Sequence, residues 1–126
     1  MIFYICEHCG NITAKLTDSG VPLICCGKRM AAMEAGSRET AAEKHIPKVS
    51  RADDRLHIEV GSTPHAMDEA HFIRWIVLET TDGFRFHPLL LHQKPEADMI
   101  LVGGERPVAV YAVCNLHGLW KSEMSL

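Results

Sequence analysis

Short runs of apolar residues, separated by turn signals, mark most of the chain after about residue 55. The first run, RLHIEV, alternates apolar with polar residues, which predicts a half-buried β-strand. The runs HFIRWIVLET, MILVG and VAVYAV follow, with turn signals at Asp82–Gly83 and Gly103–Gly104. No long helical pattern competes with them. Short strands at this spacing favour an antiparallel β-sandwich, so the predicted fold class is mostly β.

The front of the chain has a different pattern. Residues 1–35 read as short strands in FYICEH, ITAKLTD and PLICC, with turns at Gly10–Asn11 and Ser19–Gly20. So few short strands cannot form an independent core, and a bound metal is the simplest way to hold them. From Ala31 to about Ala42 the chain is small and polar, which predicts a linker. The predicted organisation is a domain at residues 1–36 and a second domain at 37–126.

Composition narrows the class of protein. The 126 residues are 47% hydrophobic and 23% charged, with a formal net charge of −3. This balance is ordinary for a globular protein and favours neither a nucleic-acid partner nor a membrane partner. The apolar run MIFYI is too short for a signal-peptide core, and no later run approaches a membrane span. We expect a cytoplasmic location.

Cysteine usage then points to metal binding. Five cysteines in a reducing compartment argue against a disulfide framework, and eight histidines are many for this length. Four of the cysteines form two pairs at the front: Cys6, Cys9, Cys25 and Cys26. Two cysteines separated by two residues can reach one ion, and Gly10 and Gly27 permit the tight turns. The spacing predicts a tetrathiolate site and leaves zinc, iron or unligated thiols open.

A resemblance favours iron at this site. The stretch YICEHCGNITAKLTDSGVPLICCGKRM resembles the desulforedoxin-type domain, a rubredoxin-like module in which the second cysteine pair is adjacent. That family binds one iron through four cysteines. The resemblance therefore implies a tetrathiolate iron, with a tetrahedron distorted by the adjacent pair.

A second group of candidate ligands lies further along the chain. His45, His65, His71 and His117 flank turns, and the fifth cysteine, Cys114, is three residues from His117. A single histidine is more often simply exposed or hydrogen-bonded. We give that interpretation to His8, His57, His87 and His92. Four histidines near turns with an unpaired cysteine instead favour a second metal site.

Nearly the full chain resembles one family, the two-iron superoxide reductases called desulfoferrodoxins. The segments EKHIP, VGSTPHAMDEAHFIRWI, KPEA and CNLHGLW occur in the family's order behind the front domain. The resemblance implies an immunoglobulin-like β-sandwich and a catalytic iron with four equatorial histidines and an axial cysteine. These ligands are His45, His65, His71, His117 and Cys114. Ala66 stands where the family commonly has proline, so we expect an adjusted loop and a retained ligand.

The resemblance also implies roles for two charged residues. Lys44 would draw in superoxide and stabilise its reduced form, and Glu43 would supply a carboxylate to the sixth position of oxidised iron. On the dipeptide alone, a solvated ion pair would be the commoner interpretation. Imidazoles suit iron(II), and a thiolate opposite the open position increases the electron density available to a small oxidant.

The implied reaction is one-electron reduction of superoxide to hydrogen peroxide without release of dioxygen. The implied partners are a rubredoxin-like electron donor and a second copy of the chain in a homodimer. One alternative is a one-electron carrier or redox sensor that uses the tetrathiolate iron. Another is a zinc-stabilised binding module.

Overall fold

The chain forms two compact units, Met1–Glu34 and Ala35–Leu126. The computed structural model describes residues 1–36, 45–61 and 65–124. The predicted domain limits, 1–36 and 37–126, stay a prediction because residues 37–44 lie outside the described ranges. Each unit is described by itself below.

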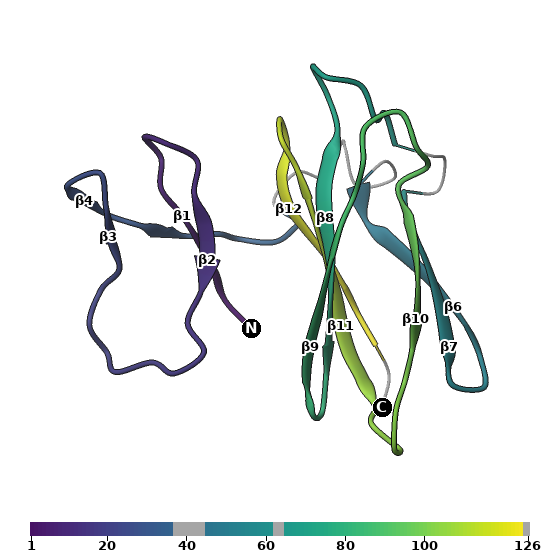
Figure 1. Cartoon of the computed structure of the whole chain (residues 1–126). Helices are drawn as coiled ribbons and strands as arrows, with labels where there is room; N and C mark the ends of the chain where they lie inside the picture. The colour runs from purple at the N-terminus through teal and green to yellow at the C-terminus, as the bar shows by residue number, and fades with distance from the viewer. Residues whose placement is uncertain (37–44, 62–64, 125–126) are drawn as a thin grey trace. The chain divides into compact units, whose positions relative to one another are not determined.

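The first unit is built from short strands (Figure 1). They are β1 (Phe3–Ile5), β2 (Ile12–Ala14), β3 (Ile24–Cys25), β4 (Lys28–Arg29) and β5 (Ala31–Ala32). Strand β1 lies between β2 and β5, and β3 pairs with β4 in a separate hairpin. The prediction of a linker beginning at Ala31 is wrong, because Ala31–Ala32 pairs antiparallel with Tyr4–Ile5. Two alanines carry no strand periodicity of their own, so this strand depends on its partner.

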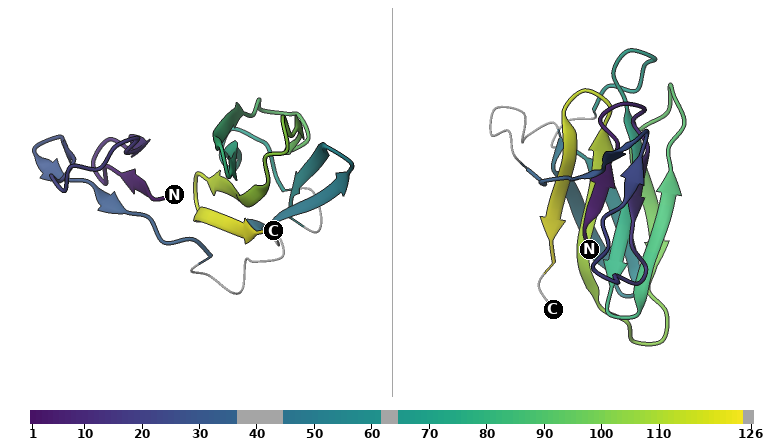
Figure 2. Two further views of the ribbon diagram at one scale, coloured as in Figure 1. Left: turned by 90° about the horizontal axis from the view of Figure 1, so that it is seen from below. Right: turned by 90° about the vertical axis from the view of Figure 1, so that its left-hand side faces the viewer.

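The second unit is an antiparallel β-sandwich, which confirms the predicted fold class. Its strands are β6 (Pro47–Ala52), β7 (Arg55–Val60), β8 (Ile73–Thr80), β9 (Gly83–Pro88), β10 (Glu96–Ile100), β11 (Pro107–Cys114) and β12 (Gly118–Glu123). One sheet has the order β10-β7-β6 and the other β12-β11-β8-β9. Figure 2 shows these sheets from two further directions. In the described ranges, no helix is long and apolar enough to cross a membrane.

The core of the second unit lies between the two sheets. Leu56, Ile58 and Val60 of β7 are fully buried, as the alternation in RLHIEV predicts. Ile76 and Val110, on β8 and β11, belong to the same cluster. Removing an aliphatic side chain of this size from water stabilises the fold by about 1.5–3 kcal/mol. The core thus fixes the central strands β7, β8 and β11.

Strands β8, β11 and β12 begin or finish at the same end of the four-stranded sheet. Cys114, the last residue of β11, lies opposite Ile73 of β8 and Gly118 of β12. The register shifts between Val113 and Cys114, as at a β-bulge. Gly118 has a φ of 80°, which lets the chain turn directly from His117 into β12. This end of the sheet therefore brings the residues around positions 71, 114 and 117 together.

Candidate metal centres

The four front cysteines converge on one point. Their sulfur atoms all lie within 4.8 Å of one another, and the sulfurs of Cys9 and Cys25 are 3.6 Å apart. Each pair comes from a tight turn. In the first turn, the Gly10 N–H donates to the Cys6 carbonyl at 2.8 Å.

The second turn explains how adjacent cysteines reach the same point. Cys25 and Lys28 are the last paired residues of the β3–β4 hairpin, so its loop is Cys26–Gly27. Both loop residues have positive φ, 54° and 75°. Positive φ at both positions is the signature of a type I′ hairpin turn, in which the second position suits glycine. The hairpin therefore holds Cys25 on the strand and Cys26 in the turn beside it.

The electrostatics of this cluster call for a cation. The Cys9 N–H lies 3.5 Å from the Cys6 sulfur and is the main cause that lowers the pKa of the Cys6 thiol to about 6. The pKa of Cys26 is raised to about 12, chiefly by its side-chain contacts with Cys9 and Cys6. Thiolates this close repel one another, so all four ionise together only around a positive ion. The residues fit a tetrathiolate metal.

The second cluster gathers ligands from segments far apart in the chain. His45 precedes β6, His65 and His71 precede β8, and Cys114 and His117 lie where β11 turns into β12. The Nε2 atom of His45 is 2.9 Å from Nε2 of His65 and 3.1 Å from Nδ1 of His117. Nδ1 of His117 is 3.6 Å from the Cys114 sulfur. One donor atom each of His45, His65, His71 and Cys114 lies within 4.8 Å of the others.

The burial of three candidate ligands favours metal binding at this cluster. His45 is 1% exposed, His65 5% and Cys114 1%. The pKa of His65 is lowered to about 4, chiefly by burial and also by the neighbouring imidazoles of His45, His71 and His117. The His71 Nε2 atom is buried and has no hydrogen-bond partner among the described residues. A buried unpartnered nitrogen beside other imidazole nitrogens fits a shared metal ion.

A backbone carbonyl sets the orientation of His65. Its Nδ1–H donates to the carbonyl oxygen of Ala66 at 2.7 Å, which leaves the lone pair of Nε2 directed into the cluster. Because the acceptor is a main-chain oxygen, this hydrogen bond does not depend on the side chain at position 66. Alanine can therefore make it as well as the family's proline. The structure brings His65 into the cluster as expected.

Two supporting residues were not predicted from the sequence. The side chain of Asn115 accepts the Phe72 N–H at 2.8 Å and donates to the Ala70 carbonyl at 3.0 Å. Asp68 accepts the His71 N–H at 2.9 Å through Oδ1. Together they shape the loop that carries His71. The position of Asn115, between Cys114 and His117 in CNLHG, was the available signal.

Trp120 supports the cluster from the core side. Its fully buried indole stacks on the His45 ring, with centroids 4.9 Å apart and planes 20° apart. The contact restricts the orientation of that ring, since a stacked imidazole cannot turn without losing it. The other two predicted functional residues, Glu43 and Lys44, lie outside the described residues.

Comparisons with known proteins agree with this arrangement. The family model described as Desulfoferrodoxin matches residues 37–123. The desulfoferrodoxin of Syntrophotalea carbinolica is 42% identical over 121 residues, 95% of this chain and 94% of the relative. That of Nitratidesulfovibrio vulgaris is 39% identical over 121 residues, with the same coverage. The crystal structure of the superoxide reductase from Treponema pallidum has a TM-score of 0.82 at 27% identity, with 98% of each chain covered.

Proposed function

Because this chain belongs to the desulfoferrodoxin family, we propose that it is a superoxide reductase. It combines one superoxide anion with one electron and two protons to give hydrogen peroxide, and releases no dioxygen. The observation that carries the proposal is the convergence of His45, His65, His71 and His117 with Cys114, in which His45, His65 and Cys114 are buried. The two clusters match the two iron centres of the family.

The residues of the second cluster would hold the catalytic iron. Bound there, iron(II) supplies the electron that reduces superoxide. The chain's own part is to fix the donor atoms: the Ala66 carbonyl orients His65, Trp120 packs against His45, and Asn115 holds the loop of His71. The Cys114 thiolate, at the end of β11, would raise the electron density at a bound metal.

Attraction of the substrate must be local, because superoxide is an anion and the chain carries a net charge of −3. Lys44, next to His45 in the sequence, is the proposed source of that attraction. Glu43 is the proposed carboxylate that reaches the oxidised centre. Both roles rest on the family resemblance and on their position beside a ligand.

The electron comes from outside the chain, and the proposed donor is a small rubredoxin-like protein. The front tetrathiolate iron is either a relay for that electron or a structural staple for the short strands β1–β5. The cytoplasmic location stays a prediction.

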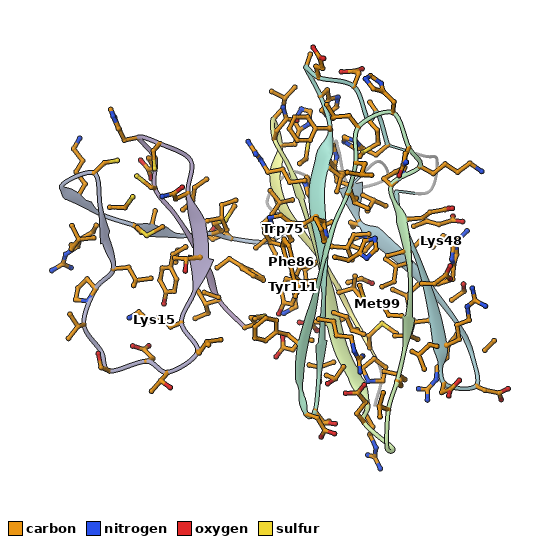
Figure 3. The ribbon with its side chains drawn as sticks, in the orientation of Figure 1. Lys15, Lys48, Trp75, Phe86, Met99 and Tyr111 are labelled. Atoms are coloured by element: carbon orange, nitrogen blue, oxygen red, sulfur yellow. The ribbon has the colours of Figure 1, made fainter. Side chains whose placement is uncertain are left out.

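We also propose a homodimer. The outer face of the four-stranded sheet carries Trp75 and Phe86 (Figure 3), with their rings 5.9 Å apart. Phe84 and Phe86 on the edge strand β9 are 46% and 56% exposed. Exposed aromatic side chains grouped on one face are typical of protein interfaces.

The experiment that tests the function uses the full chain loaded with iron. Reduced protein is mixed with superoxide, and peroxide and dioxygen are both measured. We expect one peroxide per superoxide consumed and no dioxygen; stoichiometric dioxygen would overturn the proposal.

Two cysteine variants separate the reductase from the electron-carrier alternative. Cys114→Ser should abolish peroxide formation and leave the visible absorption of the tetrathiolate iron unchanged. Cys9→Ser should change that absorption and leave peroxide formation by pre-reduced protein largely intact. Peroxide formation that survives Cys114→Ser would favour the carrier or sensor.

A further inference from the structure

The outer face of the three-stranded sheet carries a third group of possible metal ligands, apart from the two cysteine-containing clusters. His57 and Glu59 lie two residues apart on β7, and their partners on the neighbouring strand β10 are Asp98 and Glu96. Residues directly opposite in an antiparallel pair share a face of the sheet. The four side chains therefore project from rigid, paired backbone rather than from a loop.

Hydrogen bonds give the His57 ring a defined orientation. Its Nδ1 lies 2.8 Å from Oδ1 of Asp98, and the other oxygen of Asp98 lies 3.2 Å from the Arg55 guanidinium. A proton on Nδ1 is thus held by a carboxylate that is itself fixed. The opposite nitrogen, Nε2, faces Glu59 Oε1 at 3.1 Å and Glu96 Oε2 at 3.8 Å.

We propose that His57, Glu59 and Glu96 bind a divalent transition-metal cation of the zinc type. One donor atom of each lies within 4.8 Å of the others. One imidazole and two carboxylates are a donor set that zinc accepts, with water completing the coordination. Asp98 acts through His57: a carboxylate on the far nitrogen of a ligating histidine fixes its tautomer and strengthens it as a donor.

Without a metal, the same residues form an ion-pair cluster. Asp98 in the first place, and then Glu59, raise the pKa of His57 above its ordinary value. The cation would replace the proton on Nε2 as the partner of both glutamates. Lys48, opposite Glu59 on β6 (Figure 3), brings a positive charge to the neighbouring strand and would limit the affinity, while Arg55 pairs with Asp98.

The site would join two strands of the sheet through side chains. Glu96 belongs to β10, while His57 and Glu59 belong to β7. A cation that binds only the folded state stabilises it in proportion to the logarithm of its concentration over the dissociation constant. Zinc binding should therefore raise the unfolding temperature of the native chain.

The test titrates zinc into the iron-loaded full chain by calorimetry near pH 7.5, after chelation of loosely bound metal. The visible absorption of the tetrathiolate iron, followed in parallel, reports any exchange at the front site. The variants are His57→Gln, Asp98→Asn and, as a matched control, His87→Gln, which removes another strand histidine on the other sheet.

We expect one zinc per chain beyond the two irons, bound at micromolar free zinc, with the iron absorption unchanged. His57→Gln should weaken binding by at least about 100-fold and Asp98→Asn by about 10-fold, while His87→Gln should have no effect. Failure to bind below millimolar zinc, or equal binding by His57→Gln, would overturn the proposal and leave an ion-pair cluster only.

Discussion

Asn115 joins two segments that carry ligands of the second cluster. Its side chain makes two hydrogen bonds to the segment that ends in His71, at 2.8 and 3.0 Å. Its own N–H donates to the Phe72 carbonyl at 3.1 Å. The segment before β8 is thereby attached to the end of β11, where Cys114 lies.

Replacing Asn115 by alanine should loosen this attachment. The change leaves the Phe72 N–H without its acceptor, so the free energy of unfolding should fall by about 1–3 kcal/mol. The iron affinity of the second cluster, the histidine-rich site with Cys114, should fall by about 10–100-fold, as for other supporting residues of metal sites. Chelator competition followed by metal analysis measures the affinity, and urea unfolding measures the stability.

The matched control is Asn11→Ala, whose side chain donates to the Cys25 sulfur at 3.7 Å in the front cluster. It should leave the histidine-rich site unchanged. If Asn115→Ala retains iron as tightly as the native chain does, the supporting role is refuted.

Lys44 is the residue whose charge should be visible in the kinetics. Lys44→Ala should slow the reaction with superoxide by about 10-fold at low salt, because local steering of an anion is lost. The dependence of the rate on ionic strength should become flatter. Rapid-mixing or pulse-radiolysis measurements at several salt concentrations test both effects, with Lys48→Ala on β6 as the control. An unchanged rate and salt dependence would remove Lys44 from the mechanism.

The ligand residues could be predicted from the sequence, but their supports could not. Cysteine and histidine ligands can be recognised in the sequence by their residue type and spacing. Asn115 and Asp68 act through backbone N–H and C=O groups of other segments, which become neighbours only in the fold. His57 is hydrogen-bonded, as interpreted from the sequence, but its partner Asp98 on β10 lies opposite it only in the sheet.

At the level of elements, the apolar runs in the sequence predict the central strands of the sandwich better than its edge strands. The runs in the sequence predict β7, β8 and β11, which are the central strands of the sandwich, and locate β10 within a few residues. Strand β10 also lies at a sheet edge, as do β6, β9 and β12, which the runs do not predict. Edge strands are half-exposed, so exposed polar and aromatic residues such as those of GFRFHP break the apolar pattern. Backbone pairing with a central strand defines them instead.

Glu105 links two turns of the sandwich and should control its acid stability. It is buried, pairs with Arg85, and accepts the Val102 N–H at 3.0 Å and the Thr80 hydroxyl at 2.9 Å. Arg85 is the main cause that lowers the pKa of Glu105 below its ordinary value of 4.5. The carboxylate therefore stabilises the fold above about pH 4.5, and this stabilisation is lost as the pH falls through the lower folded pKa.

Glu105→Gln should lower the unfolding temperature at pH 7 and flatten its decline below about pH 4.5. Circular dichroism melts between about pH 3 and pH 7 measure both. Thr80→Val removes one of the contacts of Glu105, together with the acceptor of the Asp82 N–H, and leaves the charge of Glu105 in place, so the acid-dependent decline should persist. An acid profile for Glu105→Gln that matches the native one would assign the acid sensitivity to other groups.

At the level of the whole molecule, the aromatic outer face of the four-stranded sheet should govern assembly. Phe86 lies on edge strand β9, next to Trp75 of β8. Phe86→Lys introduces a charge there and should weaken the proposed homodimer by about 10-fold or more. Analytical ultracentrifugation over a range of concentrations measures the change. Ile100→Lys, at a similarly exposed apolar residue on β10, is the control and should leave the assembly intact. A native chain that sediments as a monomer at all concentrations would refute the homodimer.

The two clusters also differ in when their donors exist. During synthesis, all four front cysteines are made before His45, and the β3–β4 hairpin that presents Cys25 and Cys26 is local in the chain. The other cluster pairs His45 with His117, 72 residues later. Since chains emerge from the ribosome starting at the N-terminus, the front cluster is complete on a nascent chain that still lacks most of the sandwich. The histidine-rich cluster is complete only after β11 has been made, so cellular metal delivery meets the two sites in a fixed order.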